Sequence, residues 1–482
     1  MTYAYCGILI LNASCVLRVG VISCVWEAKI MLFERKIYSK FLAWKNETKG
    51  KKVLLVEGAR RIGKSTVVEE FARNEYKSYI FIDFARASDD VKSYFHLHLN
   101  DLDTFFMLLS VNYGVQLYPR ESIIIFDEVQ LYPKAREAIK YLVADGRYDY
   151  IETGSLISIR ENVQGIVIPS EERKIKMYPL DFEEFCWALD ERPLIPYIKT
   201  CFEKKESLER NLHNKAMLLF KQYMLVGGMP MAVVAFLEGH KDFGAADLEK
   251  RDILALYRND IMKIHAQYRA KVLAIFDQIP GLLSRHEKRV VFNRIVEGSK
   301  AEQYEETFFW LSDSMLANEC RKANDPNVGL SLTETDACIK CYLGDTGLLV
   351  SHAFDENELL EDEVYKQIFA GKLGLNEGML YENVIAQMLV ANGHRLFFYT
   401  QYNDKKRRND IEIDFIISNN SKTKYKIFPI EVKSSPQYSN ASLIRFKEKY
   451  KSRIGGSYII HPRNVMEKDD ILCIPPYMTI CL

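Results

Sequence analysis

The sequence has no excess of charge of either sign. Lysine plus arginine and aspartate plus glutamate number 65 each, which argues against a surface coated in positive charge. A local basic groove remains compatible with this balance, because nucleic acid responds to a patch rather than to a sum. Internal repeats and low-complexity tracts are absent as well. At 482 residues the chain is too long for one ordinary core, and we expect two or three domains.

The cysteines do not form a disulfide framework. The ten cysteines are scattered along the chain, which is typical of reduced thiols in a cytosolic protein, so we expect a cytoplasmic location. Cys338 and Cys341 have the spacing of a zinc pair, with Cys320 and His352 as candidate partners. A strand at this place would point the two sulfurs to opposite faces, which does not favour zinc.

Long apolar runs are missing after the first thirty residues. Residues 1–25 are mostly apolar, with Arg18 as the only charge. Polar residues interrupt this stretch and no basic start precedes it, so neither a signal peptide nor a membrane span fits well. Because an ordinary start follows at Met31, we expect residues 1–30 to be a non-core extension, with a membrane anchor as the less favoured alternative. A membrane is not expected to be a partner of the rest of the chain.

Short apolar runs alternate with helical patterns from residue 52 onwards. Four runs predict buried strands of a parallel sheet, at residues 53–56, 79–84, 122–126 and 150–153. Candidate helices between them lie at residues 64–73 and 134–144. This alternation predicts an α/β sheet covered on both faces.

The first of these strands runs directly into a phosphate-binding motif. Residues 58–65 read GARRIGKS, which matches GxxxxGKS between a strand and a helix. The glycines let the backbone N–H groups of the loop point at phosphate oxygens, and the helix adds its positive end. We expect Lys64 to reach the β- and γ-phosphates and the Ser65 hydroxyl to bind Mg²⁺. The predicted ligands are ATP and Mg²⁺, and the predicted nucleotide-binding residues are Gly58, Ala59, Arg60, Arg61, Ile62, Gly63, Lys64, Ser65 and Thr66.

Polar residues follow two of the other predicted strands. Asp127 and Glu128 come directly after an apolar strand, at the end where ligands bind in an open α/β sheet. We expect Asp127 to hold Mg²⁺ through water and Glu128 to polarise the attacking water. Thr153 or Ser155 is a candidate sensor of the γ-phosphate at the end of the next strand, with a simple turn as the alternative.

Residues 31 to about 352 resemble the AAA-type ATPases of prokaryotes whose tail is a conserved domain of unknown function. The resemblance implies a nucleotide-driven switch, often oligomeric, that needs an arginine from a neighbouring subunit; Arg160, Arg173 and Arg258 are candidates. It rests on the segments GARRIGKST (58–66), IIIFDEVQ (123–130), TGS (153–155), MYPLDFEEF (177–185), LVGGMP (225–230) and YLGDTGLL (342–349).

The carboxyl-terminal part carries a second acidic constellation. Asp414, Glu431 and Lys433 resemble the metal-binding core of restriction-endonuclease-like folds, and Glu382 on a preceding helix would complete the ligand set. Glu431 and Lys433 are two residues apart on one strand and therefore face the same side. The alternative is a pair of alternating strands whose outward positions carry charge. A basic run at residues 405–408 would touch a phosphate backbone, although such a run is more often a solvated loop.

The predicted fold class is α/β: an AAA-type P-loop sheet, a helical middle with a candidate winged helix, and a restriction-endonuclease-like α/β domain. The domains are expected at residues 1–30 (extension), 31–200 (ATPase), 201–265 (helical lid), 266–352 (candidate winged helix) and 353–482 (nuclease-like). The leading function is a Mg²⁺-dependent ATPase, acting as a switch coupled to a domain that handles DNA or a protein partner. An ATP-regulated metal-dependent nuclease, and an ATP-binding interaction module without nuclease activity, are the two alternatives. A homo-oligomer is a further candidate partner.

Overall fold

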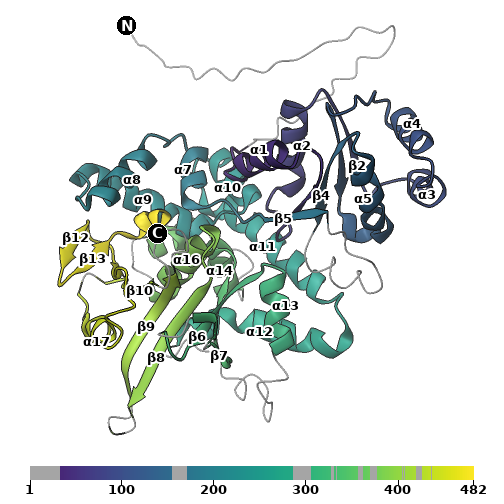
Figure 1. Cartoon of the computed structure of the whole chain (residues 1–482). Coiled ribbons are helices and arrows are strands. Elements are labelled where there is room, and N and C mark those ends of the chain that lie inside the picture. The colour runs from purple at the N-terminus through teal and green to yellow at the C-terminus, as the bar shows by residue number, and fades with distance from the viewer. Residues whose placement is uncertain are drawn as a thin grey trace, which may run out of the picture. The chain divides into compact units, whose positions relative to one another are not determined.

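The computed structural model describes most of the chain beyond residue 32 (Figure 1). The described residues are 33–154, 171–285, 305–326, 330–332, 334–355, 362–369, 377–403, 405, 408–418, 426–435 and 437–482. The prediction for residues 1–30 and the candidate residues Ser155 and Arg160 lie outside them.

The amino-terminal half contains a five-stranded parallel sheet in the order β2-β3-β4-β1-β5. The first four strands were predicted from their apolar runs and are confirmed. The fifth was missed because its sequence, ERKIK, contains a single apolar residue. The strands are β1 (Val53–Glu57), β2 (Ser78–Asp83), β3 (Ser122–Asp127), β4 (Asp149–Gly154) and β5 (Glu172–Lys176).

Helices cover both faces of this sheet, as Figure 1 shows. Successive side chains of a strand point to opposite faces, so Ile123 and Ile125 on β3 join one core and Ile124 and Phe126 join the other. The first core includes α1 (Ile37–Thr48) and α2 (Lys64–Glu75), and the second includes α3 (Asp89–Leu97), α4 (Leu102–Tyr113) and α5 (Pro133–Asp145). The apolar run of residues 123–126 in β3 is therefore what a doubly covered parallel sheet requires.

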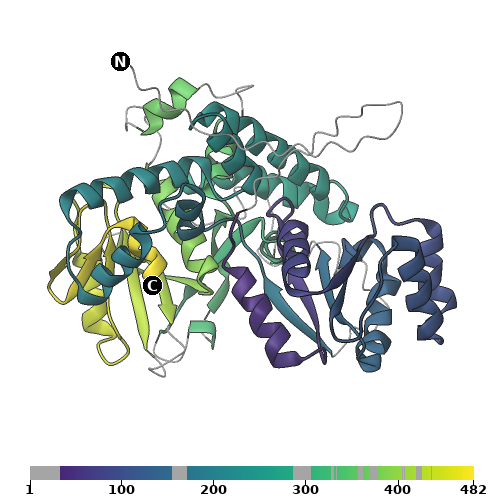
Figure 2. The ribbon, with the colours of Figure 1, turned by 90° about the horizontal axis from the view of Figure 1, so that it is seen from above.

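A run of helices follows, as the sequence pattern predicts (Figure 2). None of the described helices is by itself long and apolar enough to span a membrane; α9 and α10 meet that test only together, across a bend of 118°. The helices are α7 (Phe182–Ala188), α8 (Leu194–Lys204), α9 (Arg210–Val226), α10 (Pro230–Glu238), α11 (Phe243–Ile261), α12 (Ala266–Ser284) and α13 (Glu305–Asp313).

The carboxyl-terminal half is built on an eight-stranded mixed sheet in the order β12-β13-β11-β10-β9-β8-β6-β7. Its strands are β6 (Ala317–Ala323), β7 (Glu334–Leu343), β8 (Leu396–Asn403), β9 (Arg408–Ser418), β10 (Ile427–Val432), β11 (Tyr458–Ile460), β12 (Met466–Lys468) and β13 (Ile471–Ile474). Its helices are α14 (Thr346–Ala353), α15 (Asp362–Phe369), α16 (Glu377–Ala391) and α17 (Ala441–Lys449).

The segment expected to form a winged helix differs from the expectation. Leu330–Leu332 forms a 3-10 helix and not a strand. Helix α13 ends at Asp313, because Met315 adopts a left-handed φ of 58° that no α-helix can continue through. Strand β6 then pairs with β7 on one side and with β8 on the other. The hairpin thus continues the carboxyl-terminal sheet across residue 352, and the winged helix is not confirmed.

Candidate nucleotide site and a second carboxylate cluster

The loop between β1 and α2 has the backbone geometry that a phosphate-binding loop needs. Gly63 caps α2 with a φ of 88°, a left-handed conformation that glycine adopts at little cost. A Cβ at Gly58 would lie 2.6 Å from the carbonyl oxygen of Met177, so only glycine fits there without a shift. Gly63 is therefore required by its left-handed backbone conformation, and Gly58 by the close approach of Met177.

Lys64 folds back over its own loop. Its Nζ donates hydrogen bonds to the carbonyl oxygens of Gly58 (3.0 Å) and Ala59 (2.7 Å), and the side chain is buried. Burial lowers the pKa of Lys64 to about 8, although Glu128 and Asp127 counteract this shift. The amine is therefore held at the phosphate-binding loop and is readily deprotonated at mildly alkaline pH.

The carboxylate of Asp127 contacts two other predicted site residues, which come from two different elements. The Ser65 hydroxyl on α2 donates to Asp127 on β3, with distances of 2.8 and 3.0 Å to the two carboxylate oxygens. The Thr153 hydroxyl on β4 donates to the same carboxylate. Burial raises the pKa of Asp127, while the two hydroxyl groups favour its charged form. Of the two candidate sensors, Thr153 is the one that the structure describes at the site.

Glu128 has an unusual backbone conformation. Its φ of 52° lies in the left-handed region, which a non-glycine residue adopts at a cost of order 1 kcal/mol. Its carboxylate accepts a hydrogen bond from the side-chain amide of Gln130. Strained residues of this kind cluster at functional sites. The carboxylate of Glu128 thus has a hydrogen-bond partner of its own, Gln130, whereas that of Asp127 accepts from other side chains.

Side chains from distant parts of the sequence hold the carbonyl groups of the same loop. Arg35 donates from Nη1 to the carbonyl oxygen of Ile62 (2.9 Å), and the Tyr257 hydroxyl donates to that of Arg60 (3.0 Å). Arg60 itself forms an ion pair with Asp260 on α11, at 2.8 Å. Sequence reasoning missed Arg35, Tyr257 and Asp260, since nothing in their local sequence marks a contact with a loop so far away along the chain.

The roles of the remaining predicted residues stay predictions. Arg61 and Thr66 are exposed. Among the arginine candidates, Arg173 pairs with Glu47, and Arg258 pairs with Asp277 and Asp355. These ion pairs lie within one chain, and the proposed contact of an arginine with a neighbouring subunit stays a prediction.

The carboxyl-terminal constellation does come together. The backbone N–H of Val432 donates to Asp414 across β9 and β10 (2.9 Å), and Nζ of Lys433 lies 2.9 Å from Glu431. Burial raises the pKa of Glu431 to about 7, although Lys433 counteracts this shift. Burial by itself lowers the pKa of Lys433, but Asp414, Glu431 and, on α16, Glu382 outweigh it, so the net pKa lies above the ordinary value. The four predicted residues therefore form one cluster.

A fifth charged residue in this cluster was not predicted. Lys340 on β7 has only 3% of its surface exposed, and its Nζ lies 4.0 Å from Glu382 and 3.8 Å from Asp414. A sequence signal existed, because a lysine within the apolar strand of residues 337–343 is a charge in a place where burial is expected. Among the described residues, no group of three or more His, Cys, Asp and Glu side chains could hold a metal ion.

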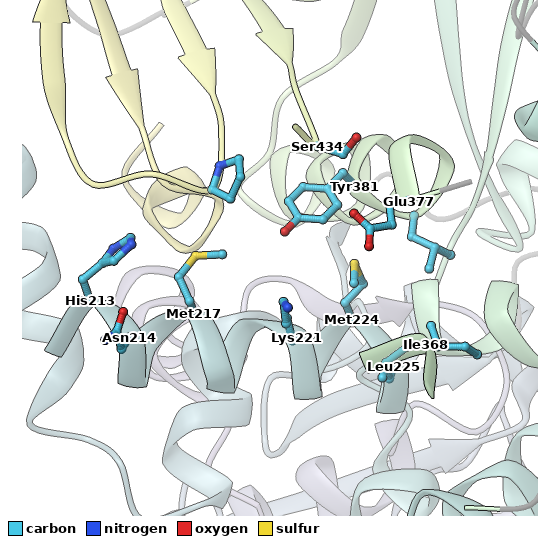
Figure 3. Close-up of a pocket in the computed structure, with 12 residues that line it drawn as sticks. His213, Asn214, Met217, Lys221, Met224, Leu225, Ile368, Glu377, Tyr381 and Ser434 are labelled. Atoms are coloured by element: carbon cyan, nitrogen blue, oxygen red, sulfur yellow. The ribbon is translucent and has the colours of Figure 1, made fainter. Parts of the chain in front are cut away.

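A cavity of about 310 Å³ lies beside this cluster, between α9 and the carboxyl-terminal half. Figure 3 shows Met217 and Lys221 on α9 facing Glu377 and Tyr381 at the start of α16 and Ser434 just after β10. Helix α16 and the segment formed by β10 and the two residues after it thus supply residues to both the cavity and the carboxylate cluster.

The parallel sheet with its strand order, the loop before α2 and the acidic pair after β3 define the class of P-loop nucleoside triphosphatases. Comparison with known proteins agrees with this class. Residues 50–186 match a family described as an AAA domain, residues 217–358 match a domain of unknown function (DUF8612), and residues 377–478 match a second one (DUF4143). The chain thus carries an AAA-type P-loop ATPase domain followed by two domains of unknown function.

Two further comparisons add little to this assignment. The Walker-type ATPase PABY2304 of Pyrococcus abyssi is similar over 67% of this chain and 96% of its own, at 16% identity and a TM-score of 0.39. No curated protein matches the sequence.

Proposed function

We propose that the protein binds ATP with Mg²⁺ and hydrolyses it, and that this cycle switches a carboxyl-terminal domain that handles DNA or a protein partner. The observation that carries the proposal is the meeting of Ser65, Thr153 and Asp127 beside the glycine-rich loop. Steady-state release of phosphate from ATP tests it, because a protein of this kind should release phosphate only when Mg²⁺ is present.

The residues at the loop fit a magnesium ion. Mg²⁺ prefers hard oxygen ligands, and the Ser65 hydroxyl and the Asp127 carboxylate supply two of them within 2.8 Å of each other. We propose that both hold the ion, Asp127 through water. The bound ion would neutralise charge on the β- and γ-phosphates.

The other side chains have separate roles in the proposal. The N–H groups of residues 58–66 bind the phosphates, and Lys64 turns from the carbonyl oxygens of its own loop to phosphate oxygens. Glu128, held by Gln130, orients the attacking water and accepts its proton. Thr153 keeps Asp127 in place through its hydrogen bond and senses the γ-phosphate.

The lowered pKa of Lys64 predicts a pH dependence of nucleotide binding. The charged amine binds phosphate, so affinity should be full below the pKa of about 8 and fall by up to about tenfold per pH unit above it. Bound phosphate raises this pKa, which flattens the loss at the highest pH. Calorimetric titration of ADP from about pH 7 to about pH 9.5 measures the effect. The Lys64→Arg chain, which keeps its charge throughout, should lose the pH dependence; the same slope in both chains would contradict the assignment to Lys64.

Helix α11 offers a physical route from the loop to the rest of the chain. Its carboxyl-terminal end carries Tyr257 and Asp260, which hold the loop. Nearer its start, buried Asp247 accepts hydrogen bonds from Ser351 on α14 (2.6 Å) and Tyr365 on α15 (2.7 Å). A helix anchored at both ends transmits a displacement of the loop as a rigid element. We propose that α11 couples nucleotide binding to the carboxyl-terminal half.

Breaking the contact at the loop should uncouple the two halves. In the parental chain, ADP is expected to slow hydrogen exchange of backbone amides in α11 and α14, because the loop then holds the helix more firmly. In the Asp260→Ala chain, which loses the ion pair to Arg60, ADP should protect the loop but not α14, and the affinity should fall by no more than about tenfold. Replacing the exposed Asp252 by alanine on the same helix is the control. Unchanged protection of α14 in Asp260→Ala would argue against α11 as the route.

A further inference from the structure

The carboxyl-terminal cluster contains a buried ammonium group between two carboxylates. Nζ of Lys340 lies 4.0 Å from Oε2 of Glu382 and 3.8 Å from Oδ1 of Asp414, and the lysine is 3% exposed. Lysine is almost never fully buried unless it is paired. Burial by itself lowers the pKa of Lys340, but Glu382 and Asp414 outweigh it, so the net pKa lies above the ordinary value. The amine is therefore charged at neutral pH.

The carboxylates of the cluster also receive hydrogen bonds and charges from the chain itself. The Tyr342 hydroxyl donates to Oε2 of Glu382 (3.1 Å), the same oxygen that faces Lys340. Asp414 accepts from the backbone N–H of Val432, and Glu431 pairs with Lys433. Protein donors thus point at Glu382 and Asp414, whereas Glu431 has Lys433 as an ion-pair partner and its two buried oxygens accept no well-aligned hydrogen bond.

This donor set does not fit a divalent metal ion. Mg²⁺ requires oxygen ligands at about 2.0–2.1 Å in octahedral geometry, and an ammonium group that already lies between two of the carboxylates repels a second cation. Here the ammonium group of Lys340 has the position between Glu382 and Asp414 that a bridging cation would need. The strand that carries Lys340 belongs to the same sheet as Asp414, so the lysine is part of the framework of the sheet and not of a surface loop.

We propose that Lys340 takes the place of a divalent cation in this cluster and closes it to metal. The carboxylates of Glu382 and Asp414 then link β7 to α16 and, across β6 and β8, to β9, and hold together the two regions that match separate domains of unknown function. The cluster consequently does not support metal-dependent cleavage of nucleic acid. This inference does not depend on ATP hydrolysis.

Manganese binding to the nucleotide-free chain tests the proposal. Electron paramagnetic resonance reports free and bound Mn²⁺, and we compare the parental chain with Lys340→Met, in which a side chain of similar length has no charge. The parental chain should bind no Mn²⁺ that depends on Asp414. Lys340→Met should gain one bound Mn²⁺ per chain, and the additional change Asp414→Asn should remove it. Lys366→Met, which breaks an exposed lysine–aspartate pair at 2.5 Å, should behave as the parental chain.

Stability gives a second, independent measurement. Removing the ammonium group leaves two buried carboxylates uncompensated, so the Tm of Lys340→Met should fall by about 5 °C or more, and Mn²⁺ should restore most of the loss. Lys340→Arg keeps the charge and should bind no Mn²⁺. If Lys340→Met does not fold, the comparison of the parental chain with Asp414→Asn decides, because the two should then bind Mn²⁺ equally weakly.

Two results would overturn the proposal. One is Mn²⁺ binding by the parental chain that Asp414→Asn abolishes. The other is a folded Lys340→Met chain that binds no more Mn²⁺ than the parental chain does. Cleavage of supercoiled plasmid by the parental chain with Mn²⁺, lost in Asp414→Asn, would have the same force as the first result.

Discussion

Replacing Lys64 by alanine is expected to abolish ATP turnover and to weaken nucleotide binding by about 100-fold, or ~3 kcal/mol. The reason is the position of this amine. It is buried at the loop, and its present hydrogen-bond partners are the carbonyl oxygens of Gly58 and Ala59. Triphosphate oxygens are stronger acceptors for a charged amine than these carbonyl groups are. Calorimetry with ADP and a phosphate-release assay measure the two losses.

The control for this change is an exposed lysine of the same domain. Lys140 on α5 is exposed, so Lys140→Ala should bind and hydrolyse ATP as the parental chain does. Should Lys64→Ala bind ADP with parental affinity, the loop would not be the nucleotide site.

Replacing Glu128 by glutamine is expected to separate binding from hydrolysis. The amide has nearly the shape of the carboxylate but cannot accept a proton from water, so hydrolysis should fall by about 100-fold or more while ATP still binds. The left-handed backbone at Glu128 and the contact of its carboxylate with Gln130 fix the position of this side chain. Single-turnover hydrolysis and equilibrium binding of ATP to the same preparation distinguish the two effects.

Glu137 provides the matched control, because it is an exposed glutamate on the helix that follows. Glu137→Gln should hydrolyse ATP at the parental rate. If Glu128→Gln also retained that rate, another residue would have to activate the water, and Glu128 would have only a structural role.

The geometry of the glycine-rich loop and of the carboxylate beside it was largely predictable because its signals are local. Residues 58–65 are consecutive in sequence and directly follow β1. The apolar strand before Asp127 places that carboxylate at the carboxyl-terminal end of a buried strand. Parallel strands place their carboxyl ends at one edge of a sheet, which is why Thr153 could be expected near Asp127 from sequence alone. Only the structure shows that Ser65 and Thr153 both donate hydrogen bonds to Asp127.

The contacts that link the two halves could not be predicted, because they join residues more than a hundred positions apart. The segments LVGGMP and YLGDTGLL illustrate the reason. A Cβ at Gly227 would lie 2.1 Å from the Asp345 carboxylate, and one at Gly347 would lie 2.2 Å from the carbonyl oxygen of Val226. Asp345 in turn accepts a hydrogen bond from the N–H of Gly228 (2.6 Å). Gly227 and Gly347 are thus explained by the contact of the two segments with each other, which no single segment reveals.

Only some strands of the carboxyl-terminal half could be predicted. Residues 395–400, 411–417, 426–432 and 456–460 are strand-like in sequence and correspond to β8 to β11, whereas β6, β12 and β13 were missed. The pairing of β6 with β8 depends on residues brought together only by the fold. The same holds for Lys340, whose partners Glu382 and Asp414 follow it by 42 and 74 positions. The restriction-endonuclease-like fold stays a prediction, and the position of Lys340 bears directly on how its carboxylates function.

Calorimetric titration of ATP into the well-folded parental chain, with and without Mg²⁺, is the most direct test of the nucleotide site. The arrangement of Lys64, Ser65 and Asp127 predicts saturable binding of one nucleotide per chain, tighter with Mg²⁺ than without it. The absence of any binding heat from ATP, at several temperatures and with Mg²⁺ present, would contradict the proposed function.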